Sequence, residues 1–100
     1  MTVIEIKRGK GRYAVRAEGH AGDERVCAAL SALVYTLGEG FSMLERRGKG
    51  KILTLRAEKG SFEIEYYSKS READAVFRAL EGGLHAVGES YPENVKIINL

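Results

Sequence analysis

Two side chains with catalytic potential lie seven residues apart in the segment GHAGDERVCAAL (residues 19–30). They are His20 and Cys27, the only cysteine of the chain. A cysteine thiolate attacks carbonyl carbon atoms, and an imidazole can take the thiol proton and later deliver it to a leaving amine. Gly22 lies between them and eases a chain reversal that would bring the two side chains together. The pair is typical of a cysteine hydrolase, or else of a small core cysteine that follows a loop histidine.

The position of Cys27 at the start of a predicted helix bears on this choice. Backbone N–H groups in the first turn of a helix have no partner within the helix, and the positive end of the helix dipole lies there. Both features favour a thiolate, and the free N–H groups could bind the oxyanion that forms when it attacks a carbonyl. A buried core cysteine also suits the small-residue face VCAALSAL, and on the pattern alone it is the favoured interpretation. The pattern alone leaves both alternatives open.

Alternating side chains on either side of this segment predict two β-hairpins. The first covers residues 2–19, with a glycine-containing turn at GKGR (residues 9–12). The second covers residues 52–68, with its turn at Lys59 and Gly60. His20 therefore follows the second predicted strand directly.

Helical periodicity predicts two helices. The first runs from about Val26 to Leu37 or a little beyond, where Gly38 and Gly40 weaken it. Because it is apolar nearly all round, we expect it to be covered on more than one side. The second begins after Ser70, a good N-cap, and ends near Tyr91.

A last strand, VKIINL (residues 95–100), gives the order ββαββαβ. This order predicts an α+β sandwich, with a mostly antiparallel sheet and two helices packed on it. One hundred residues fit a single domain, residues 1–100.

Composition limits the function classes. The formal net charge of +2 argues against a strong nucleic-acid binder taken as a whole. A single cysteine excludes an internal disulfide and is consistent with the cytoplasm. The N-terminus lacks a signal-peptide pattern, and the apolar segment 26–37 is too short to cross a bilayer, so no membrane is expected. One cysteine and two histidines at these spacings predict no metal site, and no cofactor-binding motif is present.

The segment 19–32 resembles a known family, the ribosomal-processing cysteine proteases called Prp. Gly19, His20 and Ala21 match a GHA motif that follows the second strand of the family. A second motif, G-x-D-x-V-C-A-A-x-S-A, opens its first helix. The matching residues are Gly22, Val26, Cys27, Ala28, Ala29, Ser31 and Ala32. The predicted element order also fits, so the resemblance covers the whole chain.

The resemblance implies a cysteine endopeptidase that removes the N-terminal extension of a large-subunit ribosomal protein and works as a homodimer. His20 would be the base and Cys27 the nucleophile of a dyad. Its substrate would be a protein or peptide, with nucleic acid a less favoured partner. The matched supporting or substrate-binding positions are Gly19, Gly22, Glu24 and Ser31.

The sequence departs from the family pattern in two places. The family has a longer insertion where Ala21 here runs directly into Gly22, and this affects the expected substrate more than the chemistry. Glu24 replaces an aspartate, and its neighbour Asp23 could cap the helix instead. Ser31 lies one turn after Cys27, where its hydroxyl could approach the thiolate or bond back to a helix carbonyl.

Two basic tracts separated by glycines stand apart from this motif, KRGKGR (residues 7–12) and RRGKGK (residues 46–51). If both project from the same side, they could contact ribosomal RNA or an acidic protein segment. No aromatic residue interleaves with either tract, so we interpret them as solvated turns that aid solubility. The alternative function is a non-catalytic module that binds ribosomal RNA or protein through these turns.

Overall fold

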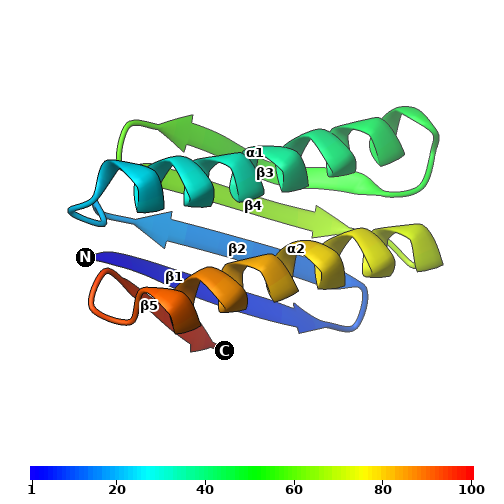
Figure 1. Ribbon diagram of the computed structural model, residues 1–100. Coiled ribbons are helices and arrows are strands. Elements are labelled where there is room, and N and C mark those ends of the chain that lie inside the picture. The colour runs from blue at the N-terminus through cyan, green and yellow to red at the C-terminus, as the bar shows by residue number, and fades with distance from the viewer.

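The computed structural model describes residues 1–100 and confirms the predicted α+β fold and element order (Figure 1). The chain forms five strands and two helices. Their bounds are β1 Thr2–Gly9, β2 Arg12–Glu18, α1 Glu24–Arg46, β3 Lys51–Glu58, β4 Ser61–Tyr67, α2 Arg71–Ser90 and β5 Val95–Asn99.

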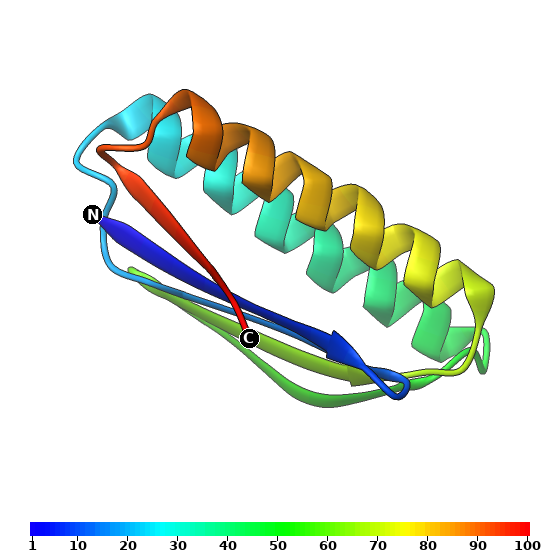
Figure 2. The ribbon, with the colours of Figure 1, turned by 90° about the horizontal axis from the view of Figure 1, so that it is seen from below.

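The five strands form one sheet in the order β3-β4-β2-β1-β5. All neighbouring strands pair antiparallel except β1 and β5, which pair in parallel. Figure 2 shows both helices side by side on one face of this sheet, while the other face is open. Alternate residues of the strands point toward the helices and form the core with them, for example Ile4, Val15 and Ile64, each at most 1% exposed.

Helix α1 continues well past its predicted end, because its two glycines make contacts that periodicity does not reveal. A Cβ atom at Gly40 would lie 3.0 Å from Cγ1 of Val76 on α2. Gly38 is buried, and a Cβ atom there would be 3.9 Å from Leu55 on β3. Each glycine disfavours a helix by about 1 kcal/mol. Close packing of Gly40 against α2 offsets part of that loss, and the helix reaches Arg46.

The length of α1 also corrects the argument that its apolar segment is too short to cross a bilayer. The helix has 23 residues and is long and apolar enough to cross a membrane by length and composition, a test that core helices also pass. In this fold one stripe of α1 is buried in the core. The buried apolar side chains of that stripe are Val26, Leu30, Val34, Leu37, Phe41 and Leu44.

Helix α2 follows its prediction closely. The Ser70 hydroxyl accepts a hydrogen bond from the N–H of Ala73 at 3.2 Å and caps the helix. A Cβ atom at Gly83 would lie 2.9 Å from Cδ2 of Leu33, so this glycine lets α2 approach α1 closely. The sheet and α2 thus cover α1 on two sides, while Tyr35 and Met43 remain exposed.

Candidate active site

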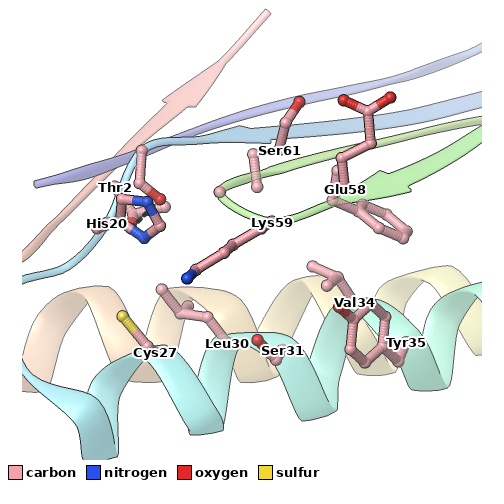
Figure 3. A pocket seen from close by; sticks show the side chains of 14 residues that line it. Thr2, His20, Cys27, Leu30, Ser31, Val34, Tyr35, Glu58, Lys59 and Ser61 are labelled. Carbon is pink, nitrogen blue, oxygen red and sulfur yellow. Dashed lines mark hydrogen bonds between the residues drawn. The ribbon is translucent and has the colours of Figure 1, made fainter.

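A pocket of about 250 Å³ opens between the N-terminal half of α1 and the turn that joins β3 to β4. Of the residues that the sequence singles out, Gly19, His20, Cys27 and Ser31 all line it. Figure 3 shows Cys27 and Ser31 on the helix side and His20 on the sheet side. The fold therefore brings the thiol and the imidazole to opposite walls of one pocket, without a hydrogen bond between them.

The short loop that carries His20 is held by backbone and side-chain hydrogen bonds from three other segments. The N–H of Gly19 donates to the carbonyl of Gly60 at 2.9 Å. Thr2 Oγ1 donates to the carbonyl of Gly19 at 3.3 Å, and Asn94 Nδ2 donates to the carbonyl of Ala21 at 2.7 Å. Gly19 has a φ of +98°, and a Cβ atom there would lie 2.5 Å from the carbonyl oxygen of Met1. These contacts fix the start of the loop.

Asp23 caps α1, as its place beside Glu24 suggested. Its Oδ1 accepts hydrogen bonds from the N–H of Arg25 at 2.8 Å and of Val26 at 3.4 Å. The N–H of Cys27 donates to the carbonyl of Asp23 at 3.0 Å. The first-turn amides of these three residues are thus already occupied, which corrects the expectation that they stand free for an oxyanion.

Glu24 and Gly22 lie outside the pocket. Glu24 is exposed on the first turn of α1 and makes no hydrogen bond with His20, so no geometry supports an orienting role for it. Gly22 is exposed with a φ of +83°, and a Cβ atom there would be 3.9 Å from Asn94 Nδ2. Its contribution is the left-handed backbone conformation that closes the loop.

Ser31 is half-buried in the pocket wall, one helical turn beyond Cys27. Its hydroxyl does not donate to a helix carbonyl, in contrast to that of Thr36, which donates to the carbonyl of Ala32 at 2.6 Å. The Ser31 hydroxyl therefore remains able to bond to a molecule in the pocket.

The β3–β4 turn supplies two residues of the site that sequence reasoning missed. Figure 3 shows the amino group of Lys59 pointing into the space between His20 and Cys27. Gly60 lies against the imidazole of His20, since a Cβ atom there would be 3.0 Å from Nε2 and 3.1 Å from Cε1. The sequence identified Lys59 and Gly60 as a turn. The hydrogen bond between Gly60 and Gly19 is a long-range contact that no local pattern encodes.

The capping carboxylate of Asp23 leads to a prediction about pH and stability. Hydrogen bonds from Arg25, first its side chain and then its backbone N–H, hold the pKa of Asp23 below its usual range. A carboxylate with a lowered pKa stabilises the fold above its unfolded pKa of about 4, and this gain is lost as pH falls through the folded pKa. We expect Asp23→Asn to reduce the loss of stability in acid, as measured by urea unfolding at a series of pH values.

The matched control is Glu24→Gln, which removes one negative charge from the same helical turn without removing a cap. A pH dependence that Glu24→Gln changes as strongly as Asp23→Asn would show that the charge of the turn matters and the cap does not.

The pocket combines a thiol on a helix, an imidazole on the facing wall and an ammonium group between them, which are groups that a cysteine hydrolase could use. Comparison with known proteins identifies the family within this class. The family model of cysteine protease Prp matches residues 1–96. The chain belongs to the Prp family of cysteine proteases and is a hydrolase.

Solved structures share its fold. The ribosomal processing protease Prp of Staphylococcus aureus, in complex with a covalently linked product peptide, is 21% identical over 100% of both chains, with a TM-score of 0.79. The same protease with a substrate peptide is 20% identical over 100% of both chains, with a TM-score of 0.75. A Streptococcus mutans protein is 25% identical over 100% of this chain and 96% of its own, with a TM-score of 0.71. No curated protein matches the chain.

Proposed function

We propose that Cys27 and His20 form the catalytic dyad of an endopeptidase that removes the N-terminal extension of a ribosomal protein. One observation carries the proposal: the two side chains reach the same open pocket from different elements, Cys27 from α1 and His20 from the loop after β2. The resemblance of the GHA and VCAALSA motifs supports the same two residues. The Staphylococcus aureus protease of the same fold binds a substrate peptide, which supports a peptide as the ligand here.

In the proposed reaction the Cys27 thiol transfers its proton to His20, and the thiolate sulfur attacks the scissile carbonyl carbon. His20 then gives the proton to the amine as the peptide C–N bond breaks, which leaves an acyl group on the sulfur. Water, deprotonated by His20, attacks the acyl carbon, and the sulfur leaves and regains a proton. Because the amides of Arg25, Val26 and Cys27 are occupied, the Lys59 ammonium is the cation placed to stabilise the oxyanion.

Three exposed apolar side chains on α1 and β3 support a homodimer. Tyr35 on α1, which lines the pocket, is 53% exposed, and Leu53 and Leu55 on β3 are 41% and 48% exposed. Large exposed apolar side chains mark protein–protein contacts where they gather into a patch. We infer that these three side chains form such a patch at the contact between two subunits, and that the protein with its single free cysteine works in the cytoplasm.

The test of the dyad is the alkylation of Cys27 by iodoacetamide, which reacts with thiolates rather than thiols. We expect alkylation of the wild-type protein at neutral pH to be at least about tenfold faster than that of His20→Ala. Equal rates in the two proteins would mean that the imidazole does not activate the thiol. The dyad would then be wrong, and the pocket cysteine would be structural.

Gly60 is expected to position the imidazole of His20. In Gly60→Ala the new methyl group must displace the ring, and misplacement of a catalytic group by about 1 Å slows a reaction by up to about 100-fold. We expect Gly60→Ala to slow peptide cleavage and to add nothing when His20 is already alanine. The measurement is kcat/KM of a peptide substrate for both single variants and the double variant.

The control for Gly60→Ala is Gly48→Ala. Gly48 has a φ of +74°, close to the +78° of Gly60, but nothing lies within 4 Å of a Cβ atom there. The control therefore carries the same backbone strain without a clash with His20. If both variants slow cleavage equally, strain in a turn is the cause and the positioning role is refuted.

A further inference from the structure

The two basic tracts that the sequence left as separate turns meet at one end of the molecule. Ser68, between β4 and α2, joins them: its N–H donates to the carbonyl of Gly11 at 2.9 Å, and its hydroxyl donates to the carbonyl of Lys49. Ser68 is only 2% exposed, so the junction is well packed. Figure 1 shows this end, where the β1–β2 turn, the α1–β3 connection and the β4–α2 connection meet, opposite the N-terminus of α1.

We define the basic end as residues 7–12, 46–51 and 68–71. The basic residues of the protein are concentrated in these three segments. They hold ten of the sixteen Lys and Arg residues and none of the fourteen Asp and Glu residues. The three segments therefore sum to a formal charge of +10, which the glutamates that pair with them, Glu65, Glu72 and Glu81, reduce to +7. All ten basic residues are exposed.

Most of these cations have no acidic partner. Arg8 pairs with Glu81 at 3.9 Å, Arg12 with Glu65 at 2.9 Å and Lys49 with Glu72 at 3.4 Å. The unpaired cations are Lys7, Lys10, Arg46, Arg47, Lys51, Lys69 and Arg71. Seven free cations gathered on one end form a strong positive potential, which is the footprint of a polyanion site.

The fold also supplies the aromatic side chain that neither tract contains. Tyr67 pairs across the sheet with Arg12 on one side and Lys51 on the other, so it stands between the ends of the two tracts. Its neighbour Tyr66 points into the core, so Tyr67 points to the open face of the sheet, where it is 37% exposed. Part of its ring lies against Gly11, where a Cβ atom would be 3.2 Å from Cε1.

We propose that the basic end binds single-stranded RNA, with Tyr67 as a stacking platform between two rows of phosphate-binding cations. Sites for single strands combine a basic surface with an exposed aromatic ring on which an unpaired base stacks. An acidic peptide would use the cations but would gain nothing from the ring. The choice of RNA over DNA rests on the proposed function, because the proposed substrate is a ribosomal protein, a class of protein that binds RNA.

Figure 1 shows the start of α1 and the β3–β4 turn, whose residues line the pocket, at the end of the sheet away from the basic end, in a molecule with a longest extent of 38 Å. An extended chain of roughly eleven residues spans that distance. A substrate protein held near RNA at the basic end could thus reach Cys27 with a flexible terminal segment. The two sites do not overlap, so loss of RNA binding should leave the alkylation of Cys27 unchanged.

The test is the fluorescence anisotropy of a labelled oligouridine RNA of about 12 nucleotides, titrated with the full chain at several salt concentrations. We expect binding that weakens with salt, with a log–log slope of up to about −5 if all seven free cations contact phosphates. Reversal of charge in the double variant Lys10→Glu with Lys51→Glu should weaken binding by about tenfold or more and reduce the slope. The control is Lys96→Glu, an exposed lysine at the other edge of the sheet, which is compared with each of the two single variants so that the change in charge is equal, and which should change binding by less than about twofold.

Tyr67 variants separate stacking from a structural role. Tyr67→Phe keeps the ring and should bind as the wild type does. Tyr67→Leu still covers Gly11 but offers no aromatic face, so it should bind about tenfold more weakly at unchanged melting temperature. Equal binding by Tyr67→Leu and the wild type would refute the platform.

Three further outcomes would overturn the proposal. Equal weakening by Lys96→Glu would mean attraction to the whole protein rather than to this end. Equal affinity for polyglutamate would mean an acidic protein partner, and tighter binding of a DNA strand of the same length would exclude RNA as the preferred ligand. The failure of these experiments would leave the dyad intact, because alkylation of Cys27 by iodoacetamide is measured without RNA.

Discussion

Replacing Cys27 with alanine is expected to abolish peptide cleavage, and replacing His20 with alanine is expected to reduce it to near background. Without the sulfur no acyl intermediate can form. Without the imidazole the thiol loses its base, and the amine loses its acid, a double role whose loss slows turnover by about 100-fold to 10,000-fold. The measurement is kcat/KM with a peptide that spans the N-terminal extension of a ribosomal protein, together with the circular dichroism of each variant.

The chain provides a matched control for the histidine. His85, the second histidine, lies half-buried on α2 and does not line the pocket. His85→Ala should therefore cleave as the wild type does. Full activity in Cys27→Ala, or equal losses in His85→Ala and His20→Ala, would contradict the dyad. Because Cys27 is half-buried and His20 is exposed, we expect both catalytic variants to keep the wild-type fold.

The sequence predicted the elements of the fold well, because each depends on local periodicity. Alternation identified both hairpins, and a good N-cap at Ser70 located the start of α2. The end of α1 was wrong for a non-local reason. Gly38 and Gly40 disfavour a helix locally, but Gly40 also allows the close approach of α2, and that packing supports the helix.

In the candidate site, too, the sequence predicted what depends on local pattern and missed what depends on long-range contacts. His20 and Cys27 were predicted from a short motif, but the wall that faces them comes from the β3–β4 turn, far away in the sequence. Lys59 and Gly60 reach the pocket because β4 pairs with β2, which places the turn beside Gly19. Only strand pairing reveals such neighbours, and a single sequence does not encode that pairing in any local pattern.

The charge of the protein illustrates a second limit. A net charge of +2 suggested a mild surface, since counting charges discards their positions. Strand register restores the positions: Arg12, Tyr67 and Lys51 stand in one row across the sheet. Tyr67 on β4 thus adds, between the two basic tracts, an aromatic ring that neither tract contains.

Gly50 allows the second tract to reach this row, and Gly50→Ala is expected to destabilise the fold strongly. Its φ is +143°, and a Cβ atom would lie 2.5 Å from the carbonyl oxygen of Tyr67 and 2.6 Å from the hydroxyl oxygen of Tyr66. Neither atom can retreat easily, because Tyr67, the last residue of β4, pairs with strands on both sides, and the Tyr66 ring is buried and stacks on Phe41 at 4.2 Å.

We therefore expect Gly50→Ala to lower the free energy of unfolding by about 3 kcal/mol or more, as measured by urea denaturation. The Gly48→Ala control carries a left-handed φ but no clash, so it should lose only about 1 kcal/mol. Equal losses in the two variants would mean that backbone strain alone is responsible. A larger loss in Gly50→Ala would show that the φ of +143° and the close contact with β4 together hold the second basic tract next to Tyr67.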